Sequence, residues 1–204
     1  MGDGLFCRRA ASFNKWIKGD ALKDARVLYK TLYARVEMSI RNEIESDIKQ
    51  VYTINESAFE TNEEADIVNA LREKVEGVIS LVATEEGKVV GHIMFSPVTI
   101  EGAPDKLLYG LAPMAVSPKF QNKGIGSLLV EAGLKACKAQ NISAVFVLGH
   151  PNYYPRFGFI PTTQFDIKSE YDVPDNVFMA LELEAGSLSK VNGILKYSEA
   201  FGSV

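Results

Sequence analysis

The stretch from Met114 to Leu129 contains the residues whose types and spacing have the clearest chemical potential. It reads as the end of a strand, a proline, a polar loop with glycines at positions 124 and 126, and the start of a helix. Glycines in such a loop can adopt positive φ and let a ligand approach the backbone, while the helix that begins there presents unpaired N–H groups and the positive end of its dipole. The spacing therefore predicts an anion-binding site, with an ordinary strand-to-helix turn as the alternative.

Two common anion sites do not fit this loop. A P-loop requires the pattern G-x-x-x-x-G-K-[S/T], but here Lys123 precedes Gly124 and the loop does not begin with glycine. The dinucleotide-binding fingerprint requires a third glycine, and Leu129 occupies that position. The next predicted strand also ends in Gly149-His150, where an acidic residue for the ribose would be expected. Nucleoside triphosphates and NAD are therefore disfavoured as ligands.

A proline lies just upstream, within a segment that otherwise reads as an interior strand. Pro113 donates no hydrogen bond to a ladder, and prolines in sheets are confined to edges, strand starts and bulges. A bulge or splay at Pro113 would leave the N–H groups from Met114 to Val116 free to pair with an extended ligand, and would open a cleft toward the next parallel strand. The alternative is an edge strand that tolerates the proline.

Other reactive residues are few. Cys7 and Cys137 lie far apart in dissimilar contexts, which excludes a disulfide framework and a C-x-x-C metal or redox site. We expect Cys137 to be an inert core thiol, because no activating partner is evident. His92 and His150 lie in separate segments, so a histidine-rich metal site is not expected. A reduced, cytoplasmic setting is the default expectation.

The periodicity of apolar residues predicts the elements that must position these groups. The expected helices span residues 22–36, 43–58, 62–75 and 124–140, and the expected strands span 36–40, 78–83, 89–98, 107–116, 142–148, 177–183 and 194–197. The turn-like composition of residues 85–88 predicts a hairpin. The continuous apolar run 142–148 is typical of a parallel strand buried on both faces, with the preceding helix as its crossover. These patterns predict an α/β fold with a mixed sheet.

The composition is typical of one globular domain. The chain has 204 residues, of which 47% are apolar and 24% charged, and no apolar run approaches the roughly 18 residues that a membrane-spanning helix needs. Residues 1–35 carry eight lysines or arginines against three acids, whereas residues 36–204 carry a net charge of −9. The acidic body argues against nucleic acid as a partner and mildly favours a cationic partner or substrate.

Residues 1–35 are interpreted as a basic helical extension before a main domain of residues 36–204. The first 18 residues are basic and weakly similar to a transit or membrane-surface segment. The plainer interpretation is a helix that packs on its own domain or on a neighbouring subunit, which leaves a homodimer open.

Two motifs at the right separation resemble those of a known family. Gln121-x-x-Gly124-x-Gly126 resembles the Q/R-x-x-G-x-G/A loop of the GNAT superfamily of acetyl-CoA-dependent N-acyltransferases, and the segment 153–159 (YYPRFGF) resembles their F-Y-x-x-x-G-F segment. The order of elements between residues 36 and 160 is also similar, while residues 1–35 lie outside the resemblance. The resemblance implies a mixed, mostly antiparallel, splayed sheet with helices on both faces, a GNAT-like fold.

The resemblance also assigns roles to residues of this chain. Backbone N–H groups from Gln121 to Ser127 would hold the CoA diphosphate, Met114 and Val116 would pair with the pantetheine arm, and the Met114 N–H would polarise the thioester carbonyl. The cofactor-binding residues expected on this basis are Met114, Ala115, Val116, Gln121, Asn122, Lys123, Gly124, Ile125, Gly126, Ser127, Asn152 and Tyr154, and the catalytic residues are Tyr154 and Met114.

Tyr154 is the acid that the resemblance implies for protonating the departing thiolate. A phenol with an ordinary pKa near 10 stays protonated at neutral pH and is therefore able to donate. Pro155 disfavours helical angles at Tyr154, so Tyr153 is the alternative acid. Val147 stands where the family often has an asparagine, and Asn152 is the expected substitute.

No general base is evident in the sequence. The predicted central strand lacks the carboxylate that family members often carry there, and Glu56, Glu60 and His92 are the candidates, with structural or solvated roles as the alternative. The functional prediction is an N-acetyltransferase that moves the acetyl group of acetyl-CoA to a primary amine of a small molecule or peptide by direct attack, without a metal. The alternative is a non-catalytic acyl-CoA-binding or regulatory module.

Overall fold

The computed structural model describes residues 38–202 of the chain. The basic extension expected over residues 1–35, and its helix at 22–36, lie outside the described residues. The strand expected over 36–40 is present as β1, which spans Met38–Asn42. Within the described residues, no helix has the length and apolar character that crossing a membrane requires.

The remaining elements follow the predicted order. The helices are α3 (Ile48–Ala58), α4 (Glu63–Lys74) and α5 (Ile125–Ala139). The strands after β1 are β2 (Ile79–Glu85), β3 (Lys88–Ile100), β4 (Leu108–Val116), β5 (Ala144–Leu148), β6 (Ile160–Pro161), β7 (Ile167–Ser169), β8 (Phe178–Glu182) and β9 (Gly193–Lys196). The two that the sequence did not reveal, β6 and β7, have two and three residues, too few to show an alternating pattern.

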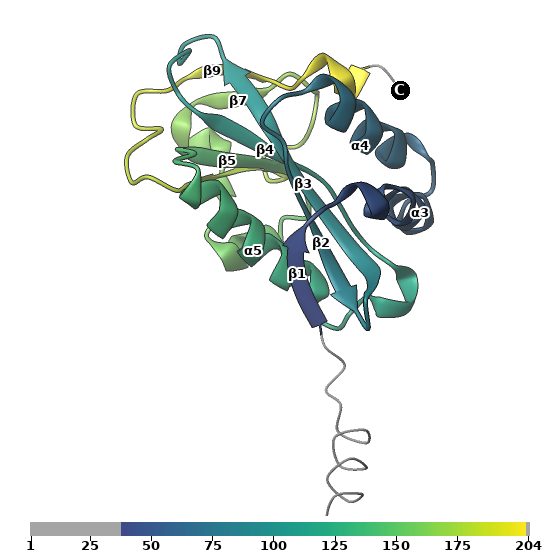
Figure 1. The fold of residues 1–204 in the computed structure, drawn as a ribbon. Coiled ribbons are helices and arrows are strands. Elements are labelled where there is room, and N and C mark those ends of the chain that lie inside the picture. Colours follow the sequence, from purple (N-terminus) through teal and green to yellow (C-terminus); the bar gives the residue numbers. More distant parts are fainter. Residues whose placement is uncertain (1–37, 203–204) are drawn as a thin grey trace, which may run out of the picture. The chain divides into compact units, whose positions relative to one another are not determined.

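The strands form a mixed sheet in the order β1-β2-β3-β4-β5-β8-β6, with β9 joining the end of β3 to β7. The pairs along the main path are antiparallel except β4 with β5, which is parallel and is connected through α5. Helices cover both faces of the sheet, α5 on one and α3 with α4 on the other (Figure 1). The predicted fold class is therefore confirmed.

Successive residues of the central strands bury their side chains in two different cores. On β3, Ile93 and Phe95 pack in the cluster beneath α5, whereas Met94 between them packs beneath α3 and α4. This alternation follows from the two-residue period of a strand. Because both faces are covered, β3 reads as an almost continuous apolar run.

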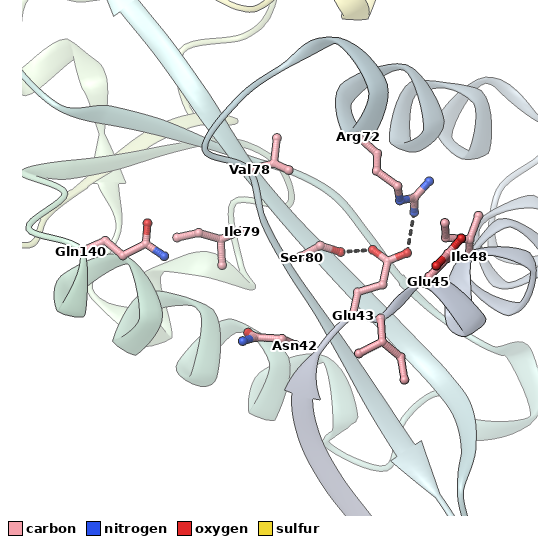
Figure 2. A pocket seen from close by; sticks show the side chains of 10 residues that line it. Asn42, Glu43, Glu45, Ile48, Arg72, Val78, Ile79, Ser80 and Gln140 are labelled. Carbon is pink, nitrogen blue, oxygen red and sulfur yellow. Dashed lines mark hydrogen bonds and ion pairs between the residues drawn. The ribbon is translucent and has the colours of Figure 1, made fainter.

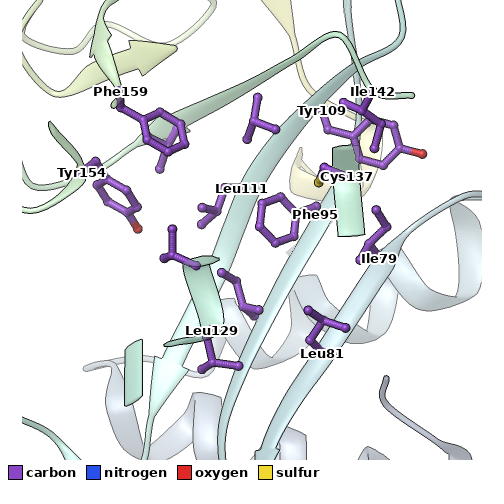
Figure 3. Packing of buried hydrophobic residues seen from close by; sticks show 14 of the residues in the cluster. Ile79, Leu81, Phe95, Tyr109, Leu111, Leu129, Cys137, Ile142, Tyr154 and Phe159 are labelled. Carbon is purple, nitrogen blue, oxygen red and sulfur yellow. The ribbon is translucent and has the colours of Figure 1, made fainter. Parts of the chain in front are cut away.

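The core beneath α5 extends as far as the aromatic residues that follow β5. Figure 3 shows Tyr154 and Phe159 on one side of this cluster and Ile79 and Tyr109 on the other. Cys137 of α5 is fully buried in it, and burial raises the pKa of its thiol to about 12. The prediction that Cys137 is an inert core thiol is confirmed.

The first long helix begins later than the sequence predicted. The expected helix at 43–58 is divided into a short 3-10 turn, η1 (Glu45–Asp47), and α3, which begins at Ile48. The Asp47 carboxylate holds this turn in place, because it accepts two hydrogen bonds from the Arg41 guanidinium and, as in a capping box, one from the Ile44 N–H. The guanidinium holds the pKa of the Asp47 carboxyl below its usual value.

Strand β4 bulges and then separates from β5 at Pro113, where the peptide bond with Ala112 is cis. Between the pairs Ile93 with Met114 and Phe95 with Leu111, β4 has one residue more than β3. Pairing with β5 covers only residues 108–111 of β4, so the two strands part beyond that point. The predicted bulge and splay are confirmed, and the edge-strand alternative is wrong because β4 lies between two strands.

Candidate active site

The end of β4 presents peptide groups to the open side of the splay. The Ser117 N–H donates to the Val90 carbonyl at 2.9 Å. Along a strand of an antiparallel pair, residues whose N–H and C=O groups bond the partner strand alternate with residues whose N–H and C=O groups point away from it. Counting back from Ser117, Val116 and Met114 direct their N–H and C=O groups away from β3. The Val116 carbonyl indeed accepts a hydrogen bond from Gln121 Nε2, at 3.0 Å.

The loop after β4 brings the N-terminus of α5 to the same place. Asn122 and Gly124 both have left-handed φ values, 61° and 85°, which reverse the chain into the helix. Asparagine and glycine tolerate this region better than other residues. The bond that enters α5 joins the Leu128 N–H to the Gly124 carbonyl, so the preceding N–H groups point out of the helix end, where the dipole favours an anion.

A cavity of about 500 Å³ lies between this loop and the aromatic segment after β5, and we call it the loop cavity. Its lining residues are Met114, Val116, Phe120, Gln121, Asn122, Gly124, Ile125, Gly126, Ser127, His150, Tyr153, Tyr154 and Arg156. Nine of the twelve residues expected to bind the cofactor are among them. The volume is within the range of small-molecule sites.

The other three expected residues do not line the loop cavity. Ala115 points to the opposite face of β4 and packs beneath α3 and α4, as the strand period requires. The Lys123 ammonium lies 4.8 Å from the centre of the Phe120 ring, and Asn152 is exposed after β5. The geometry therefore brings together the loop glycines and the end of β4, but gives no support to Ala115 or Asn152 as ligand contacts.

Tyr154 is buried at the point where β5 ends. Its ring lies so close to Gly149 that a Cβ atom at that position would overlap ring carbon Cε2. Burial, and secondly the neighbouring Tyr153 phenol, raise the pKa of Tyr154 well above its ordinary value, so its hydroxyl stays protonated. Tyr154 begins a one-turn 3-10 helix, η3 (Tyr154–Phe157), in which Pro155 at the second position removes no intrahelical hydrogen bond.

Tyr153 also faces the loop cavity, but from a more exposed position. Its ring packs edge-on against Tyr154, with centroids 5.1 Å apart, and the Arg156 guanidinium lies 4.5 Å from its centre. The Tyr153 hydroxyl is 2.9 Å from where a Cβ of Gly126 would be, so the second loop glycine makes room for it. Both tyrosines therefore remain candidates for contact with a ligand in this cavity.

A second cavity, of about 550 Å³, lies on the other side of the splay, and we call it the splay cavity. Its lining residues are Phe59, Glu64, Ile67, Leu111, Ala112, Pro113, Met114, Leu148, Gly149, His150, Pro151, Tyr154, Val173, Val177 and Phe201. Met114, His150 and Tyr154 line both cavities. A reaction between one molecule in each cavity would therefore take place beside these three residues.

Three polar residues of this site were missed as candidates, and one of them, Arg156, lines the loop cavity. His150 is exposed at the boundary of the two cavities, and Glu64 of α4 lines the splay cavity. A signal for His150 was available, because it directly follows a parallel strand beside the splay, where α/β sheets bind ligands. The helical period gave a weak signal for Glu64, because Ile67, Val68 and Leu71 follow it on the same helix face, whereas Glu63 is followed at three residues by Asp66.

The candidate bases Glu56 and Glu60 are exposed and are not among the lining residues of either cavity. His92 is fully buried beneath α3, where burial lowers its pKa to about 3 and keeps it neutral. Its Nδ1 accepts a hydrogen bond from the Asn55 amide at 3.2 Å, so the ring hydrogen is on Nε2 and faces Ser80 Oγ at 3.0 Å. The geometry thus removes His92 from the catalytic candidates.

The polar cluster around Ser80 has the residue types of a nucleophilic triad without its arrangement. Ser80 donates its hydroxyl hydrogen to Glu43, whose other carboxylate oxygen accepts from Arg72 Nη2 at 2.6 Å (Figure 2). The serine hydrogen is therefore directed at a carboxylate, while His92 donates to the serine oxygen and cannot act as its base. This network joins the end of β1 to β2, β3 and α4, and its role is structural.

Sequence comparison connects this site with known proteins. Residues 45–159 match the acetyltransferase (GNAT) family. The uncharacterised N-acetyltransferase YhbS of Escherichia coli K12 is 35% identical over 165 residues, which cover 80% of this chain and 98% of that protein. Another uncharacterised N-acetyltransferase of the same strain, YjhQ, is 44% identical over 119 residues, which cover 57% of this chain and 64% of that protein.

Solved structures show the same fold. The crystal structure of E. coli YhbS in complex with CoA has a TM-score of 0.77 and 33% identity, covering 82% of this chain and 93% of that one. A GNAT family acetyltransferase from Brucella melitensis in complex with acetyl-CoA has a TM-score of 0.67 and 33% identity, covering 82% of this chain and 99% of that one.

Proposed function

The chain belongs to the GNAT family of acetyltransferases, and from this membership we propose that it transfers the acetyl group of acetyl-CoA to a primary amine by direct attack. The single observation that carries the proposal is the pair of outward-facing peptide groups at Met114 and Val116 beside the N-terminus of α5. The acyl donor would occupy the loop cavity and the amine the splay cavity.

The residues of the loop cavity fit the acyl donor. A diphosphate is favoured at the open N–H groups from Ile125 to Ser127, and the missing side chains at Gly124 and Gly126 let it approach the backbone. The extended pantetheine arm carries amides that pair with the free edge of β4 as a further strand would. The CoA and acetyl-CoA complexes of the two structural relatives support this assignment.

Met114 is proposed to stabilise the charge that develops on the thioester oxygen. Its N–H points into the splay, where no strand of residues 38–202 pairs with it, so it is a preorganised donor for that oxygen. Such a donor contributes roughly 100- to 1000-fold in rate, because it stabilises the transition state more than the ground state.

Tyr154 is proposed to donate its hydroxyl hydrogen to the sulfur as the C–N bond forms and the C–S bond breaks. The electron pair of the C–S bond goes to sulfur, and the raised pKa of Tyr154 ensures that a proton is present to meet it. The attacking ammonium loses two protons in all: one restores Tyr154 and the other leaves to water. His150 lines both cavities and is exposed, so it is placed to carry the second proton out.

Acetyl-CoA binding and thiol release test the proposal in two steps. Acetyl-CoA should raise the melting temperature of the full chain, and a panel of primary amines should then release free CoA thiol. Binding without thiol release from any amine would favour the alternative, a non-catalytic acyl-CoA-binding module. Absence of both would contradict either function.

A further inference from the structure

The wall of the splay cavity is mostly apolar. Ten of its side chains are hydrocarbon in character and come from five separate segments of the chain: Phe59, Ile67, Leu111, Ala112, Pro113, Leu148, Pro151, Val173, Val177 and Phe201. Burying apolar surface of a ligand against such a wall is favourable, and each buried methylene raises affinity by about fourfold. The cavity therefore selects a molecule with an apolar body.

One carboxylate interrupts this wall. Glu64 lies in the first turn of α4, and its Oε2 atom is buried without a hydrogen-bond partner among the described residues. A buried carboxylate oxygen without a partner is unfavourable, and a ligand that brings a positive charge or N–H donors would satisfy it. Glu64 is the carboxylate among the lining residues, and His150 at the boundary is the other ionisable group besides Tyr154.

We propose that the splay cavity binds a primary amine with a single positive charge on an apolar body, and that Glu64 pairs with its ammonium group. The proposal rests on the proposed function for the identity of this amine as the acetyl acceptor. It narrows the acceptor class, because a second ammonium group would face hydrocarbon. Linear polyamines and lysine-rich peptides are accordingly poor ligands.

Calorimetry on the full chain in the presence of CoA tests binding without requiring acetyl transfer. The probes are 2-phenylethylamine, its uncharged counterpart 2-phenylethanol, and the diamine putrescine. The wild-type protein should bind 2-phenylethylamine at least about tenfold more tightly than the other two, since a charge-assisted hydrogen bond and the ring contacts both contribute. Equal or tighter binding of putrescine would overturn the proposal.

Glu64→Gln tests the residue itself. This variant should weaken 2-phenylethylamine about tenfold or more and leave 2-phenylethanol within twofold, whereas Glu63→Gln should change neither. Glu63 is a matched control because it is exposed and lies in the same first turn, so it has the same relation to the helix dipole. An unchanged amine affinity in Glu64→Gln would refute the pairing.

A second variant keeps the proposal testable if Glu64→Gln does not fold. Val177→Trp should fill part of the splay cavity and weaken the binding of 2-phenylethylamine at least fivefold, while the CoA-induced rise in melting temperature is retained. An unchanged affinity for 2-phenylethylamine would count against this cavity as the amine site. Thiol release provides the separate check on the proposed function. Binding of 2-phenylethylamine without thiol release would reject the proposed function and keep the inference. Thiol release with putrescine but not with 2-phenylethylamine would support the proposed function and reject the inference.

Discussion

The loop cavity and the splay cavity share Met114, His150 and Tyr154, yet they differ in whether backbone groups or side chains form them. The loop cavity depends on backbone: two glycines, a helix N-terminus and the free edge of β4. The splay cavity depends on side chains from separate parts of the chain, with one carboxylate among apolar groups. A backbone site suits a ligand common to many enzymes, whereas a side-chain site can change its specificity by substitution.

The largest effect should come from placing a charge in the loop. Gly124→Glu puts a carboxylate beside the proposed diphosphate site and a side chain at a φ of 85°. We expect acetyl-CoA affinity to fall about 1000-fold or more and the ligand-induced rise in melting temperature to disappear.

Gly87→Glu is the matched control for this variant. Gly87 has a similar φ of 77° and equally open surroundings, but it lies in the turn between β2 and β3. It should reproduce any loss of stability without the loss of binding. A comparable loss of acetyl-CoA binding in Gly87→Glu would show that backbone strain, and not the site, is responsible.

The next effect tests a residue that the two cavities share. Tyr154→Phe should lower kcat about 100-fold and leave the KM for acetyl-CoA within threefold, because the proposed role of the hydroxyl is to protonate the leaving sulfur and not to bind the donor. Steady-state thiol release measures both constants. Tyr109→Phe controls for removal of a buried hydroxyl. The Tyr109 hydroxyl donates to the Gly77 carbonyl at 2.8 Å, and Tyr109 lines neither cavity. A kcat that stays at the wild-type value in Tyr154→Phe would remove Tyr154 from this role.

The third prediction concerns His92 in the polar network beneath α3, which lines neither cavity. The folded protein holds His92 neutral, with a pKa of about 3, while the unfolded chain takes up a proton near pH 6.5. The unfolded state thus binds more protons between these values, so stability falls as pH falls. From pH 6.5 to 5 the loss should be about 2 kcal/mol, measured by urea unfolding.

His92→Gln should flatten this dependence, because it removes the buried group that takes up a proton only on unfolding. The Asp47 carboxyl is stabilised in its charged form by Arg41, so its contribution is lost only at more acidic pH. A wild-type stability that stays constant from pH 6.5 to 5 would contradict the buried neutral imidazole.

The smallest effect is expected at the tyrosine beside Tyr154. Tyr153→Phe should change kcat by less than about threefold, because its hydroxyl lies at the loop glycine Gly126 and the residue does not line the splay cavity. Parallel kinetics of the two phenylalanine variants decide which phenol serves the sulfur. A larger loss in Tyr153→Phe than in Tyr154→Phe would reverse the assignment.

Much of the fold was predictable because the signals are local. The two-residue and 3.6-residue periods located the central strands and the three described helices, and Pro113 indicated the bulge and splay of β4. The short turn before α3 was not predictable, because the Arg41–Asp47 contact that holds it joins a strand residue to the turn and leaves no trace in the apolar period. Strand β7 was also hidden, because its three residues gain their order by pairing with β9.

The sequence by itself determined the glycine-bearing loop for which we propose anion binding, since glycine spacing and a helix start are properties of one continuous segment. It could name Tyr153 and Tyr154 as neighbours but could not separate them, because burial against Gly149 is a tertiary contact. It could not reveal Glu64, His150 or the apolar wall as one site, because their segments meet only when β4 and β5 part and α4 packs beside them. A site made of backbone groups depends on one continuous segment and can be predicted from it, whereas a cavity of side chains forms only when distant segments pack together.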